Sequence, residues 1–431
     1  MKLENELIEF INESPTGYHA TKNVADILLK KGFKNLYEVG DYDLLKGGSY
    51  FVTRNDSAII AFTIPKDTEN MSINMVASHT DSPSFKIKPN NDISSKSYSS
   101  INTEIYGGPI VSSWLDRPLS VAGRVLLKTK DGIKTSLVNI NEDLLVIPNL
   151  PPHLNHEINS GYKYNPQIDL LPLLSLNEKD NIIDFIKNTE NLEGSILSHD
   201  LFLYPRFKGT LIGANKEMIM SSRLDDLMCV YGSLVGFLES KNDSSLNMFI
   251  AFDNEEVGSR TKQGAAGTFL KDTLRRIYSS FSLSESELDK SLNKSLLVSA
   301  DNAHAVSPNV PSKFDSLNRV YMNKGVVIKY NAANSYTTDA LSEALFLSMC
   351  SKEEVAFQRF ANRSDLRGGG TLGAISSSQL SVKSVDIGLA QLAMHSTTEV
   401  AGVADLEYLV KAMKSFYSST ISFDGSIYKI K

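Results

Sequence analysis

The stretch that decides the fold runs Ile73-Asn74-Met75-Val76-Ala77-Ser78-His79-Thr80-Asp81-Ser82-Pro83. Its first six residues are mostly apolar and predict a buried strand that ends at His79. Open α/β sheets bind ligands at the carboxyl ends of their strands, which makes His79 a candidate metal ligand. Asp81 could accept a hydrogen bond from the other ring nitrogen and so fix the tautomer. Taken alone, a His-x-Asp pair is more often part of a turn that caps a helix.

Three more apolar runs precede residues of the same kind. The segments 249–252, 296–300 and 390–394 are followed by Glu255-Glu256, Asp301 and His395. Adjacent buried glutamates are costly without a cation, although a solvated loop is the alternative for that pair. Asp225 and Asp226 precede a predicted amphipathic helix, so one of them, Asp226 in particular, could simply cap it.

These strand ends, together with Asp225, give a mixed set of histidines and carboxylates. Such a set suits zinc, manganese or cobalt. We therefore expect a dinuclear hydrolytic site with two carboxylate-bridged ions. The ions would polarise the scissile carbonyl, and a glutamate that binds neither of them would move the proton. A serine or cysteine nucleophile is not favoured, because the sequence has no Gly-x-Ser-x-Gly motif and neither cysteine has a polar, histidine-bearing neighbourhood.

Composition and charge narrow the class of protein. The chain has 431 residues, and 44 Lys and Arg against 50 Asp and Glu give a formal net charge of −6. The cations are scattered rather than clustered, so nucleic acid is not expected as a partner. No run approaches the roughly 18 apolar residues of a membrane span, and the start has no apolar leader, so we expect a cytoplasmic protein without membrane contact. Cys229 and Cys350 lie in apolar helical patterns and predict buried thiols.

The order of the predicted elements indicates an α/β domain with a β-rich insertion. Helices are expected near 3–11, 20–28, 227–238, 340–349 and 404–417, and strands near 50–53, 58–64, 73–78, 246–252, 296–300, 325–330 and 385–390. Between about 88 and 214 the chain is rich in Ser, Asn and Pro, with short strand-like runs and few helical patterns. We expect residues 1–88 and 214–431 to form a catalytic domain and residues 89–213 to form the insertion. On residue pattern alone, His153 and His156 within it are structural.

The motifs together resemble the M18 family of metallo-aminopeptidases, the aspartyl aminopeptidases, almost from end to end. The matching segments are Phe10-Ile11-Asn12 to Tyr18-His19-Ala20, Tyr50-Phe51-Val52-Thr53-Arg54-Asn55, Ser78-His79-Thr80-Asp81-Ser82-Pro83, Arg223-Leu224-Asp225-Asp226, Asn254-Glu255-Glu256-Val257-Gly258-Ser259, Ser299-Ala300-Asp301 to Ala303-His304-Ala305, and Met394-His395-Ser396. The resemblance implies a catalytic α/β domain with a central mixed sheet flanked by helices, and a β-rich inserted domain used in subunit contacts.

The resemblance also implies a role for each candidate residue. Two ions are implied, with zinc expected and manganese or cobalt as alternatives, and one of them is held by Asp225, Glu256 and His395. The other is held by His79, Asp225 and Asp301, so that Asp225 bridges the two. Glu255 is implied to be the general base, and Asp81, as the partner of His79, belongs to the catalytic group.

Assembly and specificity follow from the same resemblance. Family members usually form tetrahedral dodecamers built from dimers, in which a histidine of the inserted domain reaches the site of a neighbouring subunit. The segment Ile147-Pro148-Asn149-Leu150-Pro151-Pro152-His153-Leu154 is similar to that region and makes His153 the candidate. The expected substrates are peptides that begin with Asp or Glu. Lys329 resembles the family's basic substrate contact, and Arg363 is the alternative.

Two positions depart from the family pattern. The family often has Asn where this chain has Asp226, and His where this chain has Ser307. The first change adds a carboxylate that could compete for the bridge, and the second removes a histidine near the site. Two other functions are weighed against an aminopeptidase, namely a metal-dependent deacylase or carboxypeptidase and a non-catalytic, metal-stabilised scaffold. Glu255 argues against a scaffold, which has no need of a general base.

Overall fold

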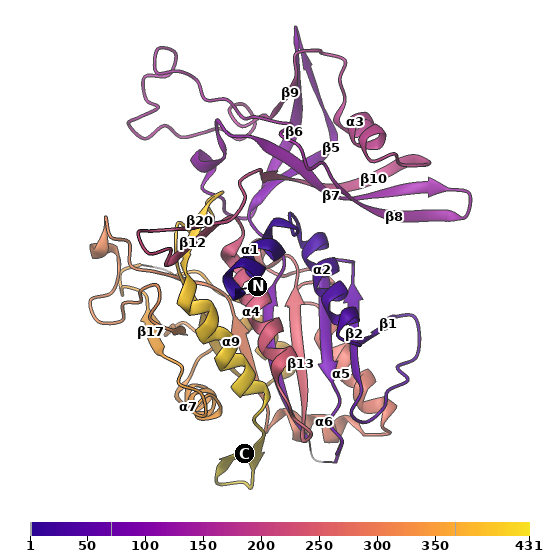
Figure 1. Ribbon diagram of the computed structural model, residues 1–431, viewed down its shortest axis with the longest axis vertical. Helices are drawn as coiled ribbons and strands as arrows, with labels where there is room; N and C mark the ends of the chain where they lie inside the picture. Colours follow the sequence, from indigo (N-terminus) through magenta and orange to yellow (C-terminus); the bar gives the residue numbers. More distant parts are fainter. Residues whose placement is uncertain (1, 70, 367) are drawn as a thin grey trace.

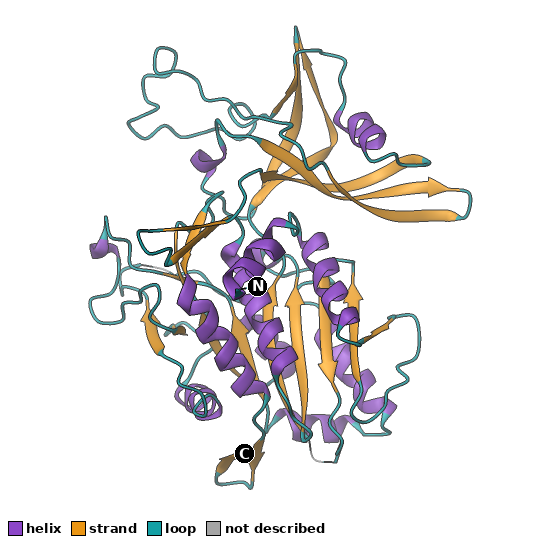
Figure 2. Ribbon diagram, viewed as in Figure 1, coloured by secondary structure: helices purple, strands orange, loops and turns teal. Residues whose placement is uncertain are grey.

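A nine-stranded mixed sheet forms the centre of the larger part of the molecule (Figures 1 and 2). The computed structural model describes residues 2–69, 71–366 and 368–431. In the order in which they pair, the strands are β1 (Lys34–Leu36), β2 (Ser49–Arg54), β3 (Ala58–Thr63), β13 (Ser245–Phe252), β4 (Ser72–His79), β14 (Leu296–Ala300), β18 (Lys383–Gly388), β16 (Val326–Tyr330) and β17 (Phe357–Ala361). The four central strands β13, β4, β14 and β18 are parallel neighbours, so their carboxyl ends meet at one edge.

Helices cover both faces of this sheet, which explains why its central strands are buried almost along their whole length. One face packs against α1 (Leu3–Asn12), α2 (Gly17–Lys30), α4 (Leu224–Glu239), α7 (Ala340–Met349) and α9 (Val403–Tyr417). The other packs against α5 (Phe269–Ser280), α6 (Glu285–Leu292) and α8 (Leu372–Leu380). All eight residues of β4 and of β13 are buried. The α/β architecture and the expected helices and strands therefore agree with the sequence prediction.

A separate six-stranded antiparallel sheet lies above the carboxyl ends of the central strands (Figure 1). Its order is β8 (Gly132–Asn139), β7 (Leu119–Thr129), β10 (Ser195–Pro205), β5 (Ser84–Ser95), β6 (Tyr98–Tyr106) and β9 (Leu173–Ser175). The helix α3 (Ile182–Thr189) packs on it, and a core of its own includes Trp114 and Phe85. The expected division at residues 88 and 214 stays a prediction, and this sheet begins at Ser84 and ends at Pro205.

A smaller, five-stranded sheet joins the two larger ones. It consists of β11 (Thr210–Ile212), β12 (Met218–Ser221), β20 (Glu399–Gly402), β19 (Ala390–Leu392) and β15 (Ala303–His304). The hairpin β21 (Ile421–Phe423) and β22 (Tyr428–Ile430) follows α9. Short 3₁₀ turns complete the structure at η1 (Val111–Trp114), η2 (Glu255–Val257) and η3 (Pro311–Lys313).

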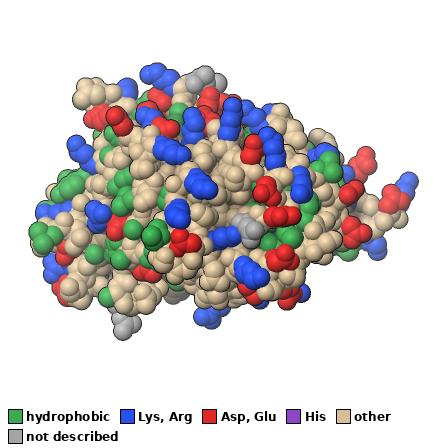
Figure 3. All heavy atoms as spheres, turned by 90° about the horizontal axis from the view of Figure 1, so that it is seen from below, with side chains coloured by type: hydrophobic (Ala, Val, Ile, Leu, Met, Phe, Trp, Pro, Cys, Tyr) green, Lys and Arg blue, Asp and Glu red, His purple; other side chains and the backbone are tan. Residues whose placement is uncertain are grey.

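The surface carries charges of both signs. On the face drawn in Figure 3, Lys and Arg side chains are interspersed with Asp and Glu, and hydrophobic side chains are scattered among them. Within the part of the chain that the structure describes, no helix is long and apolar enough to cross a membrane.

Candidate active site

Three neighbouring strands deliver acidic residues and a histidine to one edge of the central sheet. His79 is the last residue of β4 and pairs with Phe252, the last residue of β13. The chain after β13 continues directly into Glu255 and Glu256, and Asp301 follows the last residue of β14. The sequence prediction that these side chains share one edge is therefore correct, because the parallel strands end side by side.

His395 reaches the same place by a different route from the one expected. It was predicted to follow a fourth strand of the same set, but β19 belongs to the five-stranded sheet and ends at Leu392. His395 then lies in the loop between β19 and β20, with a left-handed φ of 68°. Asp225 comes from the start of α4. The site thus draws its side chains from two sheets and one helix.

The first group of potential metal ligands is His79, Asp225 and Asp301, all of which are buried. Nε2 of His79 lies 3.5 Å from Oδ1 of Asp225 and 4.0 Å from Oδ1 of Asp301. Ligand atoms that share a tetrahedral ion at about 2.0–2.2 Å lie roughly 3.3–3.6 Å apart, so the first of these spacings matches that of atoms around one ion and the second is slightly wider.

The second group is Asp225, Glu256 and His395. Nε2 of His395 lies 3.5 Å from Oδ2 of Asp225 and 3.5 Å from Oε2 of Glu256. Asp225 therefore offers one carboxylate oxygen to each group. Oδ1 of Asp225 and Oε1 of Glu256 are buried and have no hydrogen-bond partner among the described residues. Buried carboxylate oxygens of this kind are costly unless a cation satisfies them, so these residues fit a metal centre.

Burial of so many carboxyl groups shifts their pKa values in the metal-free protein. Burial raises the pKa of Glu255 to about 8 and that of Asp301 to about 6, and it raises the pKa of Glu256 well above its usual range. Asp225 differs, because His395 and His79 outweigh its burial and lower its pKa. Such opposed shifts within one cluster are typical of functional sites.

Asp81 supports both glutamates rather than the imidazole alone. Its Oδ1 accepts a hydrogen bond from the backbone N–H of Glu255 at 3.0 Å, and its Oδ2 accepts from the N–H of Glu256 at 3.2 Å and from the Tyr106 hydroxyl at 2.7 Å. Nδ1 of His79 instead lies 3.0 Å from the backbone carbonyl of Asp81, and 3.5 Å from the carboxylate. The imidazole of His79 was expected to bond to the Asp81 carboxylate, but it bonds to the Asp81 backbone carbonyl instead. The carboxylate accepts hydrogen bonds from the backbone N–H groups of Glu255 and Glu256.

Both candidate histidine ligands are oriented by a backbone carbonyl. Nδ1 of His395 lies 3.0 Å from the carbonyl oxygen of Gly108, as Nδ1 of His79 lies close to that of Asp81. A ring that donates through Nδ1 keeps Nε2 unprotonated and free for a metal. Gly108 and Glu399 contact candidate ligands, and Tyr106 contacts Asp81. Sequence reasoning missed all three. Only Glu399 had any local signal, a carboxylate four residues after His395.

Asp226 is buried but takes no part in either ligand group. Its Oδ2 accepts a hydrogen bond from the backbone N–H of His79 at 3.2 Å. Burial raises its pKa well above the usual range. The carboxyl therefore serves the strand end rather than a helix cap, and the geometry leaves Asp225 as the residue shared by the two groups.

The two basic candidates have very different surroundings. Lys329 is buried in β16, where its amine donates to the backbone carbonyls of Asp301 at 2.7 Å and Asn302 at 3.2 Å. The amine also lies 5.1 Å from the centre of the Tyr336 ring. Arg363 pairs with the Asp365 carboxylate at 2.7 Å and with a backbone carbonyl, away from both ligand groups.

His153 is exposed in the long connection between β8 and β9. Neither of the ligand groups found among the described residues contains it. Within a single chain it therefore takes no part in the candidate metal centre, and its predicted role in a neighbouring subunit's site stays a prediction.

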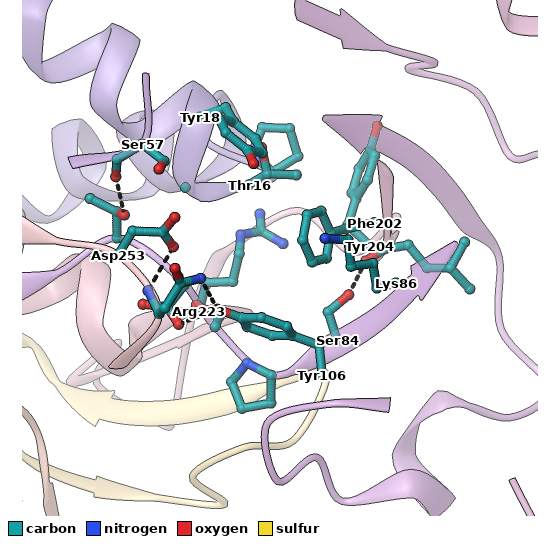
Figure 4. Close-up of a pocket in the computed structure, with 18 of the residues that line it drawn as sticks. Thr16, Tyr18, Ser57, Ser84, Lys86, Tyr106, Phe202, Tyr204, Arg223 and Asp253 are labelled. Carbon is teal, nitrogen blue, oxygen red and sulfur yellow. Dashed lines mark hydrogen bonds between the residues drawn. The ribbon is translucent and has the colours of Figure 1, made fainter. Parts of the chain in front are cut away.

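A cavity of about 340 Å³ adjoins the second ligand group (Figure 4). Asp225 and His395 line one part of it, and Tyr18, Arg223 and Phe202 line others. Figure 4 shows Arg223 reaching into the space between Tyr18 and Tyr106. The cavity is bounded by the central domain on one side and by the six-stranded sheet on the other, and it is large enough to admit part of a peptide.

Comparison with known proteins identifies the family. A family model described as Aminopeptidase I zinc metalloprotease (M18) matches residues 10–417. The chain belongs to the M18 family. It is therefore a metallo-aminopeptidase, and the resemblance seen in the sequence motifs is confirmed.

The similarity to individual M18 proteins extends over nearly the whole chain. "Probable M18 family aminopeptidase 2" of Clostridium novyi (strain NT) is 45% identical over 428 residues, covering 97% of this chain and 99% of that protein. A chain in the cryo-EM structure of the Ape4 and Nbr1 complex aligns with a TM-score of 0.92 at 34% identity, covering 96% of this chain and 85% of that one. The mApe1 dodecamer of S. cerevisiae aligns with a TM-score of 0.85 at 27% identity, covering 96% of this chain and 96% of that one. These structural neighbours confirm the predicted α/β fold with its insertion.

Proposed function

We propose that the protein is an aminopeptidase with two divalent metal ions that removes N-terminal residues from peptides, preferentially Asp or Glu. The observation that carries the proposal is the position of Asp225, whose two carboxylate oxygens each lie 3.5 Å from a different histidine Nε2. A carboxylate so placed suits a bridge between two ions. The family model favours zinc, and manganese or cobalt would suit the same ligands.

The residues around the bridge divide into ligands and a base. His79 and Asp301 would hold one ion, Glu256 and His395 the other, and Asp225 both. Ions bound there would polarise the scissile carbonyl and lower the pKa of a bound water. Glu255 lies in neither ligand group but directly precedes Glu256, which suits a carboxylate that accepts a proton from water and passes it to the leaving amine. Asp81 would hold Glu255 and Glu256 in place through their backbone N–H groups.

Lys329 is our candidate for recognising an acidic N-terminal side chain. A buried carboxylate needs a charge-assisted partner, and the Lys329 amine lies beside Asp301, a candidate ligand of one ion. Arg363 is the weaker candidate because its carboxylate partner, Asp365, belongs to neither ligand group. The substrate side chain would thus lie on the Asp301 side of the metals, and the leaving peptide would lie on the His395 side, where the cavity begins.

A homo-oligomer, and specifically a dodecamer built from dimers, is the proposed assembly. The dodecamer formed by mApe1 of S. cerevisiae, a relative with the same fold, supports this proposal. His153 lies in an exposed loop of the inserted sheet, which makes it available to a neighbouring subunit. There it would hydrogen-bond the substrate or the developing oxyanion.

The test is a turnover panel with the zinc-loaded protein. Peptides that begin with Asp, Glu, Leu or Ala are compared with N-acetylated Asp peptides and with peptides blocked at the carboxyl end. We expect fastest cleavage after free N-terminal Asp and Glu, no cleavage of the acetylated peptides, and no effect of the carboxyl-end block. Cleavage of the acetylated substrates would indicate a deacylase, and loss of turnover on blocking the carboxyl end would indicate a carboxypeptidase.

A further inference from the structure

Glu399 joins the backbones of two candidate metal ligands that are far apart in the sequence. Its Oε1 accepts a hydrogen bond from the backbone N–H of His395 at 2.6 Å, and its Oε2 accepts from the N–H of Asp225 at 2.9 Å. Glu399 and Asp225 are separated by 174 residues. The carboxylate is only 2% exposed. One buried side chain thus contacts two of the three residues of the second ligand group.

The strand pairing explains how one residue reaches both. Glu399 is the first residue of β20 and lies opposite Ser221, the last residue of β12 (Figure 1). The chain that leaves β12 runs into Asp225, and the loop that enters β20 carries His395. Neither ligand sits in regular backbone, because His395 has a left-handed φ and Asp225 has non-helical dihedral angles at the start of α4. Their N–H groups are therefore not held by a helix or strand ladder.

A buried carboxyl group such as that of Glu399 is costly unless hydrogen bonds or a cation compensate for the loss of water. Among the described residues, no Lys or Arg nitrogen lies within 4.0 Å of it, so the two backbone N–H groups are its principal partners. A residue that only stabilised the loop at His395 would need only the hydrogen bond from the N–H of His395, whereas Glu399 also accepts one from the N–H of Asp225. Two hydrogen bonds accepted by the two oxygens of one buried carboxyl group fix the separation of their donors.

We infer that Glu399 is a positioning residue that holds Asp225 and His395 at the spacing required by the ion they share with Glu256. This inference rests on the proposed two-ion function. Through the backbone of Asp225, Glu399 also affects the residue shared with the first ion, whereas His395 belongs to the second group alone. Loss of the Glu399 carboxylate should therefore weaken binding of the second ion more than binding of the first. Groups that orient metal ligands from outside typically contribute about 10–100-fold in metal affinity.

The test compares zinc binding by the wild type, Glu399→Gln and Asp405→Asn. Glutamine keeps the size of the side chain but turns an NH₂ group toward one of the two N–H donors. Asp405 is the matched control, because it is also buried and accepts backbone N–H groups, those of Asn323 at 2.6 Å and Gly325 at 2.9 Å, which are not candidate ligands. Affinity is measured by competition with a chelator, and occupancy of the two sites is followed by cobalt absorption.

We expect Glu399→Gln to bind the second ion about 10–100-fold more weakly, while Asp405→Asn loses thermal stability but binds both ions as the wild type does. Wild-type affinity for both ions in Glu399→Gln would overturn the inference and leave the proposed function intact. Binding of a single ion by the wild type would instead contradict the proposed function itself.

A second variant keeps the test decisive if Glu399→Gln does not fold. Glu399→Asp retains two acceptor oxygens and the charge, but its shorter side chain cannot reach both N–H groups at the observed separation. It should bind the second ion more weakly than the wild type and gain a smaller rise in Tm on adding zinc. An unchanged affinity and an unchanged zinc-induced rise in Tm would overturn the inference.

Discussion

The amine of Lys329 donates a 2.7 Å hydrogen bond to the backbone carbonyl of Asp301 and lies 3.6 Å from the carboxylate of the same residue. Burial alone would lower the pKa of Lys329, but Asp301 outweighs it and raises the pKa. The lysine is therefore a fixed positive charge beside a candidate metal ligand. Any change at Lys329 should affect both the charge next to the metal and the recognition of an acidic substrate.

Lys329→Met separates these two effects. We expect kcat/KM on Asp peptides to fall at least about tenfold further than kcat/KM on Leu peptides, because only the acidic side chain loses a buried charge partner. Metal content at saturating zinc should stay at the wild-type level, since Lys329 is in neither ligand group. Steady-state kinetics on the two peptides, with metal content measured in parallel, provide the check. Arg363→Met is the control, and a selective loss on Asp peptides in that variant instead would assign specificity to Arg363.

Substitution of Glu255 and of Glu256 should impair different properties, catalysis in the first case and metal binding in the second. Glu255→Gln is expected to keep its metal and to lose about 10²–10⁴ in kcat, the usual effect of removing a general base. Glu256→Gln should chiefly lose the ion it shares with His395. Metal analysis beside single-turnover kinetics distinguishes the two outcomes. Equal metal loss in both variants would mean that base and ligand roles are not divided between them.

The buried carboxyl groups predict an unusual pH dependence of the metal-free protein. Asp301 has a pKa of about 6, and Glu255 and Glu399 have pKa values of about 8, all raised by burial above the values near 4 of an unfolded chain. Between about pH 4 and 8 the folded state therefore binds more protons than the unfolded state, so these groups make the metal-free protein less stable as the pH rises.

Zinc should reverse this trend, because it binds the deprotonated ligands and releases their protons. We expect the zinc-induced rise in Tm to be larger at pH 8 than at pH 5.5. Thermal unfolding with and without zinc at both pH values gives the answer. A rise that is equal at the two pH values would show that these carboxyl groups do not control metal binding.

His153→Ala tests the contribution of a neighbouring subunit. We expect lower kcat with unchanged metal content, since the imidazole lies in neither ligand group of its own chain. The same reasoning predicts that an isolated monomer is nearly inactive. Activity is measured together with light scattering across a dilution series. Full activity in a preparation shown to be monomeric would rule out a shared site.

The sequence predicted the parts of the site that depend on local pattern. His79 and Asp301 follow uniform apolar runs, and such runs form the buried parallel strands whose ends meet. His395 was selected by the same pattern, although its strand belongs to a different sheet. For His79 and Asp301, apolar runs located the strand ends, and the resemblance to the M18 family supplied the division of roles.

The supporting residues could not be predicted in the same way. Glu399 and Gly108 act on ligands through contacts between segments far apart in the sequence, 174 residues for Glu399 and Asp225 and 287 residues for Gly108 and His395. No periodicity encodes such contacts, because they arise only when the small sheet and the inserted sheet pack against the central domain. The carboxylate of Asp81 shows the same limit, since its partners proved to be backbone N–H groups.

The most direct test of the two-ion account is a crystal structure of the zinc-loaded protein with anomalous scattering data. The account predicts two ions about 3.5–4 Å apart, with Asp225 coordinating both, His79 and Asp301 on one ion, and Glu256 and His395 on the other. A single ion, or two ions bridged by Asp226 in place of Asp225, would contradict it.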